Sequence, residues 1–175
     1  MKDKKVTKKI VLIGDAGVGK TSIVRRFVTG LFNPEYIITL GTTIMKKEIE
    51  YIDTIVNLAI WDIGGQSVFK AVRSKYYFAS EGALAICDRC NRKTIENLPS
   101  WIDSFREVVG DKPVIIVGNK SDLPNLEVSE EEIKELADKY KHAEYILTSA
   151  KDGTNVEKTF LNLTRLMFSD EEVFP

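Results

Sequence analysis

The strongest constraint on the fold is a glycine-rich segment at residues 14–21, which reads Gly-Asp-Ala-Gly-Val-Gly-Lys-Thr. It fits the pattern Gly-x4-Gly-Lys-Ser/Thr and lies between an apolar run at residues 10–13 and a segment of helical spacing at residues 21–28. Glycines let the backbone approach a phosphate closely, and the start of a helix adds a partial positive charge. The segment therefore predicts a buried strand, a phosphate-binding loop and a helix in direct succession, with Gly30 ending the helix.

Strand-like and helix-like segments alternate along the rest of the chain. Further strands are predicted at residues 44–51, 56–62, 83–88, 114–119 and 144–148, and further helices at residues 95–109, 129–140 and 156–167. The first two of these strands form a predicted hairpin that turns at Asp53 and Thr54 and places its outer strand at an exposed edge. This order predicts an α/β fold with a six-stranded, mostly parallel sheet, one antiparallel strand and helices on both faces.

Two of the predicted helices have recognisable start signals. Ser129 and Glu132 have the spacing of a capping box, and the helix that begins there would bury one apolar face. That face consists of Ile133, Leu136, Ala137 and Tyr140. Pro99 is expected in the first turn of the helix at residues 95–109, because proline has no backbone N–H to donate.

Length and charge argue against several classes of function. The 175 residues suffice for one domain, and 25 basic residues against 26 acidic ones give a net charge of −1. This balance argues against binding of nucleic acid or of an anionic membrane by charge alone. Residues 1–8 form a basic extension without the apolar stretch of a secretory signal, and no apolar run approaches the roughly 20 residues that span a bilayer. We expect a cytoplasmic monomer.

The two cysteines, Cys87 and Cys90, are too few for a disulfide framework. Their spacing is that of half a zinc site, but His142 is the single histidine and there is no second cysteine pair. We therefore expect Cys87 to be a small core residue at the end of a buried strand.

Two later motifs indicate which base the site would bind. In Asn-Lys-Ser-Asp at residues 119–122, the Asp122 carboxylate can accept hydrogen bonds from N1–H and the N2 amino group of guanine. Adenine has no matching pair of donors, so it would leave the carboxylate unpaired. Asn119 can link this loop to the phosphate loop, and the stem of Lys120 can cover the base. In Thr-Ser-Ala-Lys at residues 148–151, the Ala150 N–H can donate to guanine O6.

A third motif, Trp-Asp-Ile-Gly-Gly-Gln at residues 61–66, contains the residues expected to act on the γ-phosphate. Asp62 would hold Mg²⁺ through a water, and Thr21 would ligate the ion directly. The Gly65 N–H would donate to the γ-phosphate, and the Gln66 amide would orient the attacking water. Lys20 would reach the β- and γ-phosphates.

The loop after the first helix adds three candidates. Thr39 is a candidate second hydroxyl ligand to Mg²⁺, and Tyr36 and Phe32 would cover the phosphates and the guanine edge. The expected catalytic residues are then Gln66, Lys20 and Thr39, and the expected metal ligands are Thr21, Thr39 and, through water, Asp62. The residues expected to bind the nucleotide are Asp15, Ala16, Gly17, Val18, Gly19, Lys20, Thr21, Ser22, Phe32, Tyr36, Thr39, Gly65, Asn119, Lys120, Asp122, Ser149, Ala150 and Lys151.

These motifs stand in the order and spacing of Ras-superfamily small GTPases, and the chain resembles that family over residues 8–168. It is most similar to the Rab branch at Trp61, at the pair Tyr76-Tyr77, and at residues 82–84 and 91–98. The resemblance implies a P-loop NTPase fold of the small G-domain type at residues 9–168, followed by an acidic tail at residues 169–175. It also implies a guanine-nucleotide switch that hydrolyses GTP slowly with Mg²⁺ and regulates membrane traffic.

The same resemblance implies protein partners. Residues 34–40 and 64–77 correspond to the two switch regions, which effectors, an exchange factor and an activating protein would bind, with Ile44, Trp61 and Tyr76 as an apolar patch. No arginine lies just before Thr39, so we expect an intrinsic turnover on the order of 10⁻⁴ to 10⁻³ s⁻¹ without an activator, as in the family. The chain has no C-terminal cysteine for prenylation, so we expect either a longer native tail or a protein without a lipid anchor of the Rab kind. A cytoplasmic location is expected, with peripheral membrane association as the alternative.

Three positions depart from the family pattern, and two other functions stay open. Ala16 replaces glycine or serine and would crowd the γ-phosphate, Gly64 replaces alanine and would loosen the second switch, and Ile44 replaces the phenylalanine of an aromatic triad. Ala16 favours the alternative of a GTP-binding module with little or no hydrolysis. A P-loop ATPase or nucleotide kinase is the other alternative, and it leaves Asn119 and Asp122 without a role.

Overall fold

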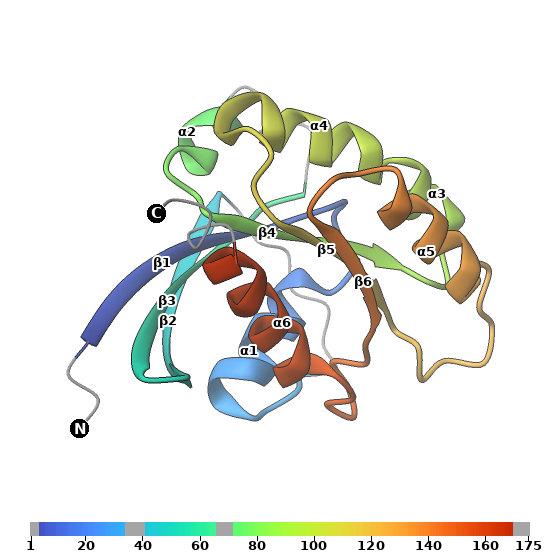
Figure 1. Cartoon of the computed structure of the whole chain (residues 1–175). Coiled ribbons are helices and arrows are strands. Elements are labelled where there is room, and N and C mark those ends of the chain that lie inside the picture. Colours follow the sequence, from blue (N-terminus) through green and yellow to red (C-terminus); the bar gives the residue numbers. More distant parts are fainter. Residues whose placement is uncertain (1–3, 34–40, 66–71, 170–175) are drawn as a thin grey trace.

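The computed structural model describes residues 4–33, 41–65 and 72–169. In these residues, six strands form one sheet in the order β2-β3-β1-β4-β5-β6, with helices on both faces (Figure 1). The strands are β1 (Lys4–Ile13), β2 (Thr42–Tyr51), β3 (Thr54–Ile63), β4 (Gly82–Asp88), β5 (Val114–Asn119) and β6 (Ala143–Leu147). The helices are α1 (Lys20–Thr29), α2 (Arg73–Tyr77), α3 (Arg92–Glu96), α4 (Leu98–Val109), α5 (Glu130–Asp138) and α6 (Val156–Ser169). The predicted α/β architecture is confirmed, since β2 pairs antiparallel with β3 and the other pairs are parallel.

The sheet separates two apolar layers. Alternate strand residues point to opposite faces, so Ile10 and Leu12 pack with α1 and α6, while Val11 and Ile13 pack with α2 to α5. Figure 1 shows this division, with α1 and α6 below the sheet and α2, α3, α4 and α5 above it. Both layers are closely packed, and Cys87 is fully buried in β4, as predicted.

Strand β1 is longer than its apolar core. It begins at Lys4 rather than Ile10, because it pairs with β3 from Lys4 opposite Thr54 to Leu12 opposite Asp62. Residues 4–8, predicted as a basic extension, therefore belong to the sheet. Lys8 is buried and forms an ion pair of 2.8 Å with Glu81, so tertiary pairing overrides the low strand propensity of lysine.

The β2–β3 hairpin turns one residue earlier than predicted. Tyr51 pairs with Thr54, so the turn residues are Ile52 and Asp53, and Thr54 already belongs to β3. This register places Ile49 opposite Val56, and both side chains are buried. A shift of one residue would move these side chains to the other face of the sheet, so burial selects the observed turn.

The single helix predicted at residues 95–109 is two helices. α3 ends at Glu96, Asn97 separates the two, and α4 begins at Leu98 with Pro99 in its first turn. Proline fits only the first turn, where its missing N–H has no helical partner, so a new helix starts there. Two smaller differences follow. Tyr140, predicted on the buried face of the helix at residues 129–140, lies after the end of α5 and is only half-buried. Helix α2 was not predicted.

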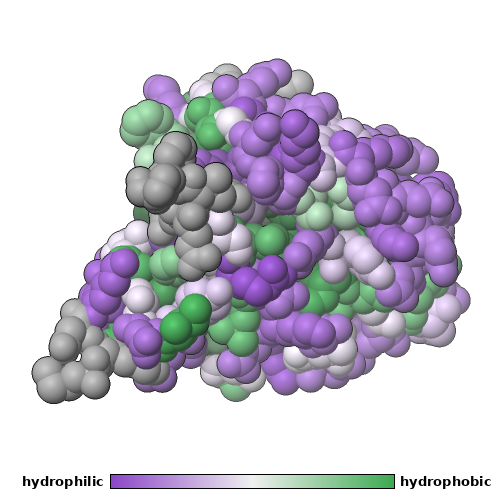
Figure 2. Space-filling model, viewed as in Figure 1, coloured by the Kyte–Doolittle hydropathy of each residue, from purple (hydrophilic) through white to green (hydrophobic). Residues whose placement is uncertain are grey.

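The surface of the described residues is largely hydrophilic over α4 and α5, in the orientation of Figure 1 (Figure 2).

The predicted capping box at the start of α5 is present. The side chains of Ser129 and Glu132 each accept a hydrogen bond from the backbone N–H of the other residue. Among the described residues, no helix is both long enough and apolar enough to cross a membrane.

Candidate functional site

The phosphate loop lies where β1 ends and α1 begins, and two of its glycines leave no room for a side chain. Gly14 has φ 137° and Gly19 has φ 100°, a backbone region that residues other than glycine rarely adopt. A Cβ atom would lie 2.3 Å from the Ile86 carbonyl oxygen at Gly14 and 2.3 Å from Asn119 Nδ2 at Gly19. Glycine at these positions lets the loop pack directly on β4 and on the end of β5.

Lys20 occupies the interior of this loop. Its ammonium donates to the carbonyl oxygens of Gly14 and Asp15, each at 2.8 Å, and the residue is only 6% exposed. Burial lowers the pKa of Lys20 to about 8, although the nearby carboxylates of Asp62 and Asp15 favour the charged form. A buried cation whose described hydrogen bonds go to neutral carbonyls is well suited to bind a polyanion.

Thr21 and Asp62 form a pair of oxygen donors beside Lys20. Thr21 Oγ1 donates to Asp62 Oδ2 over 2.5 Å, and Asp62 lies at the end of β3 with 1% exposure. Hydroxyl and carboxylate oxygens are the ligands that Mg²⁺ prefers, so these residues fit the predicted ion. Among the described residues, no three His, Cys, Asp or Glu side chains group closely enough to hold a metal.

Gly65 lies against the phosphate loop itself. A Cβ atom there would be 2.3 Å from the Ala16 nitrogen and 2.5 Å from the Asp15 carbonyl carbon. The preceding residue, Gly64, is buried, and its N–H donates to the Gly41 carbonyl over 2.7 Å. Gly41, the residue that follows the first predicted switch region, is thus in direct contact with the start of the second, while the effect of Gly64 on the second switch stays a prediction.

The predicted link between the base loop and the phosphate loop is present. Asn119 Nδ2 donates to the Val18 carbonyl over 2.9 Å, and the Lys120 ammonium donates to the Gly17 carbonyl over 2.8 Å. Lys120 has φ 63°, which turns its side chain back toward the phosphate loop, and its ammonium also binds Asp88 at 2.8 Å. The side chain of Asn119 therefore links the two loops as predicted, while its contact with a nucleotide stays a prediction.

The third motif packs against the same loop. Thr148 Oγ1 and the Ala150 N–H both donate to Asn119 Oδ1, at 3.0 and 3.4 Å. Ser149 Oγ donates to Asp122 Oδ1 over 2.8 Å and so orients that carboxylate. Asp122 is nevertheless exposed to solvent. Base recognition by Asp122 and Ala150 remains a prediction, but the structure brings the two residues to one edge of the sheet.

Of the remaining residues predicted to bind the nucleotide, some lie in the described part of the chain and others do not. Ala16 is exposed, Val18 is buried, Ser22 is half-buried in α1, and Lys151 is exposed. Phe32 is half-buried and packs against the core layer of α1 and α6. Tyr36, Thr39 and Gln66 lie outside the described residues.

Sequence reasoning missed several residues that contact this site. Asp88 binds Lys120, and its position at the carboxyl end of a parallel strand could have indicated it. Asn97 and Trp101 donate to the Asp15 carboxylate from α4, and no local pattern signals that contact.

The three residues of the predicted apolar patch lie together. Ile44 pairs with Trp61 across β2 and β3 and is 48% exposed, and the Trp61 and Tyr76 rings have centroids 6.3 Å apart. The Lys9 ammonium lies 3.8 Å from the Trp61 ring centroid and donates to the Phe78 carbonyl, so a cation fixes one face of this ring.

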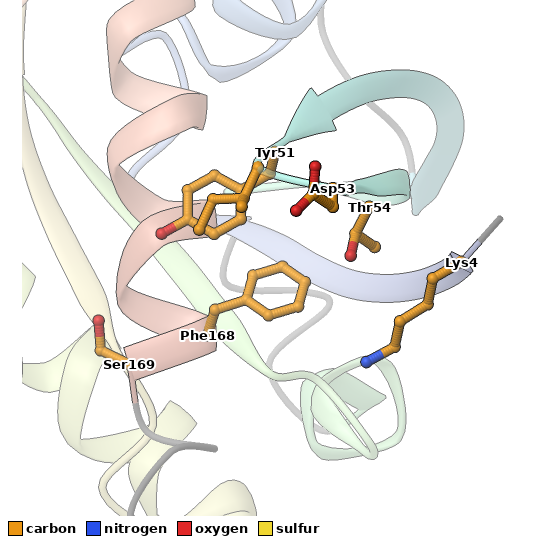
Figure 3. A pocket seen from close by; sticks show the side chains of 7 residues that line it. Lys4, Tyr51, Asp53, Thr54, Phe168 and Ser169 are labelled. Atoms are coloured by element: carbon orange, nitrogen blue, oxygen red, sulfur yellow. The ribbon is translucent and has the colours of Figure 1, made fainter. Parts of the chain in front are cut away.

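A separate hollow of about 390 Å³ lies at the other end of β1, near the β2–β3 turn and the end of α6 (Figure 3). Tyr51 and Phe168 stack there with centroids 5.1 Å apart. Its lining residues are Lys4, Tyr51, Ile52, Asp53, Thr54, Phe168 and Ser169. None of the three nucleotide motifs reaches it.

Comparison with known proteins agrees with this geometry. The model of the Ras family matches residues 9–169. The chain belongs to the Ras family. This Ras-family chain is 40% identical to the human Ras-related protein Rab-30 over 167 residues, which are 93% of the chain and 80% of the relative. It is 36% identical to human Rab-22A, covering 95% of the chain and 87% of the relative, and 34% identical to Rab-7a of Dictyostelium discoideum, covering 98% and 89%. It is a small GTPase of the Rab branch, a GTP-binding switch that hydrolyses GTP.

Proposed function

We propose that this GTPase uses residues 14–21, 119–122 and 148–151 as its nucleotide site and regulates membrane traffic. The observation that supports the site most strongly is the pair of bonds from Asn119 to Val18 and from Lys120 to Gly17. These bonds hold the predicted phosphate-binding and base-binding loops at a constant separation. Such preorganisation suits a ligand with a base at one end and a polyphosphate at the other.

The phosphates would be bound by main-chain N–H groups of the loop and by Lys20. The ammonium of Lys20 would exchange the Gly14 and Asp15 carbonyls for phosphate oxygens, which are charged acceptors and therefore stronger partners. The N-terminus of α1 would add its partial positive charge at the same point.

Thr21 and Asp62 would hold Mg²⁺, and Thr39 would supply a second hydroxyl from outside the described residues. When bound, the ion neutralises negative charge on the phosphates during transfer. The short hydrogen bond between Thr21 and Asp62 keeps both oxygens near one point before the ligand arrives.

Hydrolysis would depend on the chain after β3. The Gly65 N–H would donate to the γ-phosphate, and the close approach of Gly65 to the phosphate loop supports this role. The Gln66 amide would accept a hydrogen bond from the attacking water and orient it.

The base would be recognised at the other end of the site. Asp122 would accept hydrogen bonds from guanine N1–H and N2–H, and the Ala150 N–H would donate to guanine O6.

Partners would bind the surface formed by Ile44, Trp61 and Tyr76. These residues come from β2, β3 and α2 and adjoin both predicted switch regions. An apolar patch of this kind is typical of a protein-binding surface. Ordering of the switch regions by GTP would expose or complete it, and an exchange factor and an activating protein would bind the same area.

The nucleotide assignment is tested by competition. Purified protein is stripped with EDTA, loaded with a fluorescent GDP analogue in Mg²⁺ buffer, and challenged with GTP or ATP. We expect GTP to displace the probe at near-stoichiometric concentration and ATP to require at least about a thousandfold more, because adenine leaves Asp122 unpaired and faces a donor at Ala150. Equal competition by ATP would contradict guanine selection.

The traffic role needs its own test. In the source cells, a fluorescent fusion of the Gln66→Leu variant is expected on the membranes of vesicles or organelles. A uniform distribution of the GTP-bound variant through the cytosol would contradict this part of the proposal and leave the nucleotide site untouched.

A further inference from the structure

The side chain of Asp15 turns away from the nucleotide site. Asp15 belongs to the phosphate loop, yet both of its carboxylate oxygens are occupied by α4 and the residue before it. Asn97 Nδ2 donates to Oδ2 over 2.7 Å, and the Trp101 indole N–H donates to Oδ1 over 2.9 Å. These partners lie 82 and 86 residues further along the chain.

A carboxylate at this position needs such partners. The loop is built to receive a polyanion, and a free negative charge within it would repel phosphate. Two well-formed hydrogen bonds to a charged acceptor hold the carboxylate against α4. The backbone of the same residue is thereby positioned, including the carbonyl oxygen that accepts from Lys20 at 2.8 Å.

The contact extends from α4 to α2. The guanidinium of Arg73 lies 3.6 Å from the Trp101 ring centroid, which is within the range of a cation–π interaction. Both side chains are buried, with exposures of 8% for Arg73 and 5% for Trp101. Arg73 is the first residue of α2, the described helix of the second switch region. One indole ring thus binds the phosphate loop at its edge and α2 at its face.

We propose that Asp15 is a positioning residue that links the phosphate loop to α2 through Trp101, so that nucleotide retention depends on this link. Asn97 fixes the second oxygen of the carboxylate and prevents its rotation. Packing changes at α2 then alter the phosphate loop, and loss of nucleotide alters α2. This inference rests on nucleotide binding at residues 14–21.

The first test measures release of a fluorescent GDP analogue in Mg²⁺ buffer with excess unlabelled GDP. Asp15→Ala is expected to speed release at least about tenfold, because two hydrogen bonds to a charged group are lost. Trp101→Phe keeps an aromatic ring beside Arg73 and removes the indole donor, so it should speed release about threefold or more. The double variant should release no faster than Asp15→Ala, within about twofold, since both changes break the same contact between Asp15 and Trp101.

Arg73 supplies the test of coupling. Arg73→Gln should speed release in the wild-type background and have no further effect when Asp15 is alanine. Equal factors in the two backgrounds would show that the residues act independently and would overturn the proposal. A rate of GDP release from the Asp15→Ala variant within about twofold of the wild-type rate would also overturn the proposal. Asp138→Asn, an exposed carboxylate change on α5, is the matched control and should leave release unchanged.

A spectroscopic measurement separates positioning from general stability. The chain has two tryptophans, so an ¹⁵N–¹H spectrum has two indole signals, and Trp101→Phe assigns them. In GDP-loaded protein, Asp15→Ala should shift the Trp101 indole signal and leave Trp61 unchanged. Asp15→Asn, which retains one acceptor, should give an intermediate shift and an intermediate release rate. An unmoved Trp101 signal would disprove the bond. Protein that binds no GDP in any form would instead refute the nucleotide site itself.

Discussion

Thr21 Oγ1 lies 2.5 Å from Asp62 Oδ2, so a hydrogen bond joins the first turn of α1 to the end of β3. β1 and β3 are parallel neighbours, and their carboxyl ends open onto the same edge of the sheet. Ligand sites of open α/β sheets lie at this edge. The bond therefore joins two motifs that are 41 residues apart at the point where Mg²⁺ is proposed.

Removal of the Thr21 hydroxyl is predicted to weaken the dependence of nucleotide binding on Mg²⁺. Thr21→Ala should raise the Mg²⁺ concentration needed to slow GDP release by at least about tenfold, since a direct oxygen ligand is lost. Release rates measured over a Mg²⁺ titration give this value. Thr21→Ser keeps the hydroxyl and is the matched control; if Thr21→Ala titrates as Thr21→Ser does, Thr21 is not a ligand.

Gln66 is predicted to contribute to the rate of GTP hydrolysis and not to the affinity for nucleotide. Gln66→Leu should slow phosphate release from preloaded GTP at least about tenfold, because the attacking water loses its orienting group. The affinity for GDP should stay within about threefold of wild type. Single-turnover phosphate release measures the first and equilibrium titration the second. Equal rates of phosphate release in Gln66→Leu and wild type would remove Gln66 from the mechanism.

Asp122 is predicted to select guanine through its two acceptor oxygens. Asp122→Asn should weaken GDP binding at least about tenfold and improve binding of xanthosine diphosphate, because the amide can donate to the O2 of xanthine. Ser149 donates to Asp122 Oδ1 and should still find an acceptor in the amide oxygen. Titration with both nucleotides is the measurement, and a variant that loses guanine without gaining xanthine would argue against this recognition.

The two thiols are predicted to differ in reactivity. Burial raises the pKa of Cys87 to about 12, so near pH 8 only about one thiol in ten thousand is the reactive thiolate. Cys90 is partly exposed, and its pKa is raised by a lesser burial and by Asp88. A chromogenic disulfide reagent near pH 8 should label Cys90 slowly and Cys87 only after unfolding. Because thiolate increases with pH, labelling of Cys90 should accelerate on raising the pH, and Cys90→Ser should abolish it. Rapid labelling of both thiols in folded protein would contradict the burial of Cys87.

Much of the fold followed from local patterns. The glycine-rich segment predicted the β1–loop–α1 unit, Ser129 and Glu132 predicted the start of α5, and alternating residues predicted β2 as an edge strand. Such features depend on neighbours within a few residues, where spacing and backbone chemistry suffice. The link from Asn119 to the phosphate loop was also expected, because its motif follows a parallel strand at the same sheet edge.

Other features depend on packing between distant segments. The extension of β1 to Lys4 comes from pairing with β3, and the turn at Ile52 and Asp53 comes from the register that buries Ile49 and Val56. The contact of Asp15 with Trp101 spans 86 residues and has no local signature. The spacing of motifs thus predicted the family, which the comparisons confirm, and the nucleotide chemistry, which stays a prediction. Which side chains meet across the sheet and its helices was settled by close packing, since the same carboxylate could face phosphate or α4 until the fold brought two donors to it.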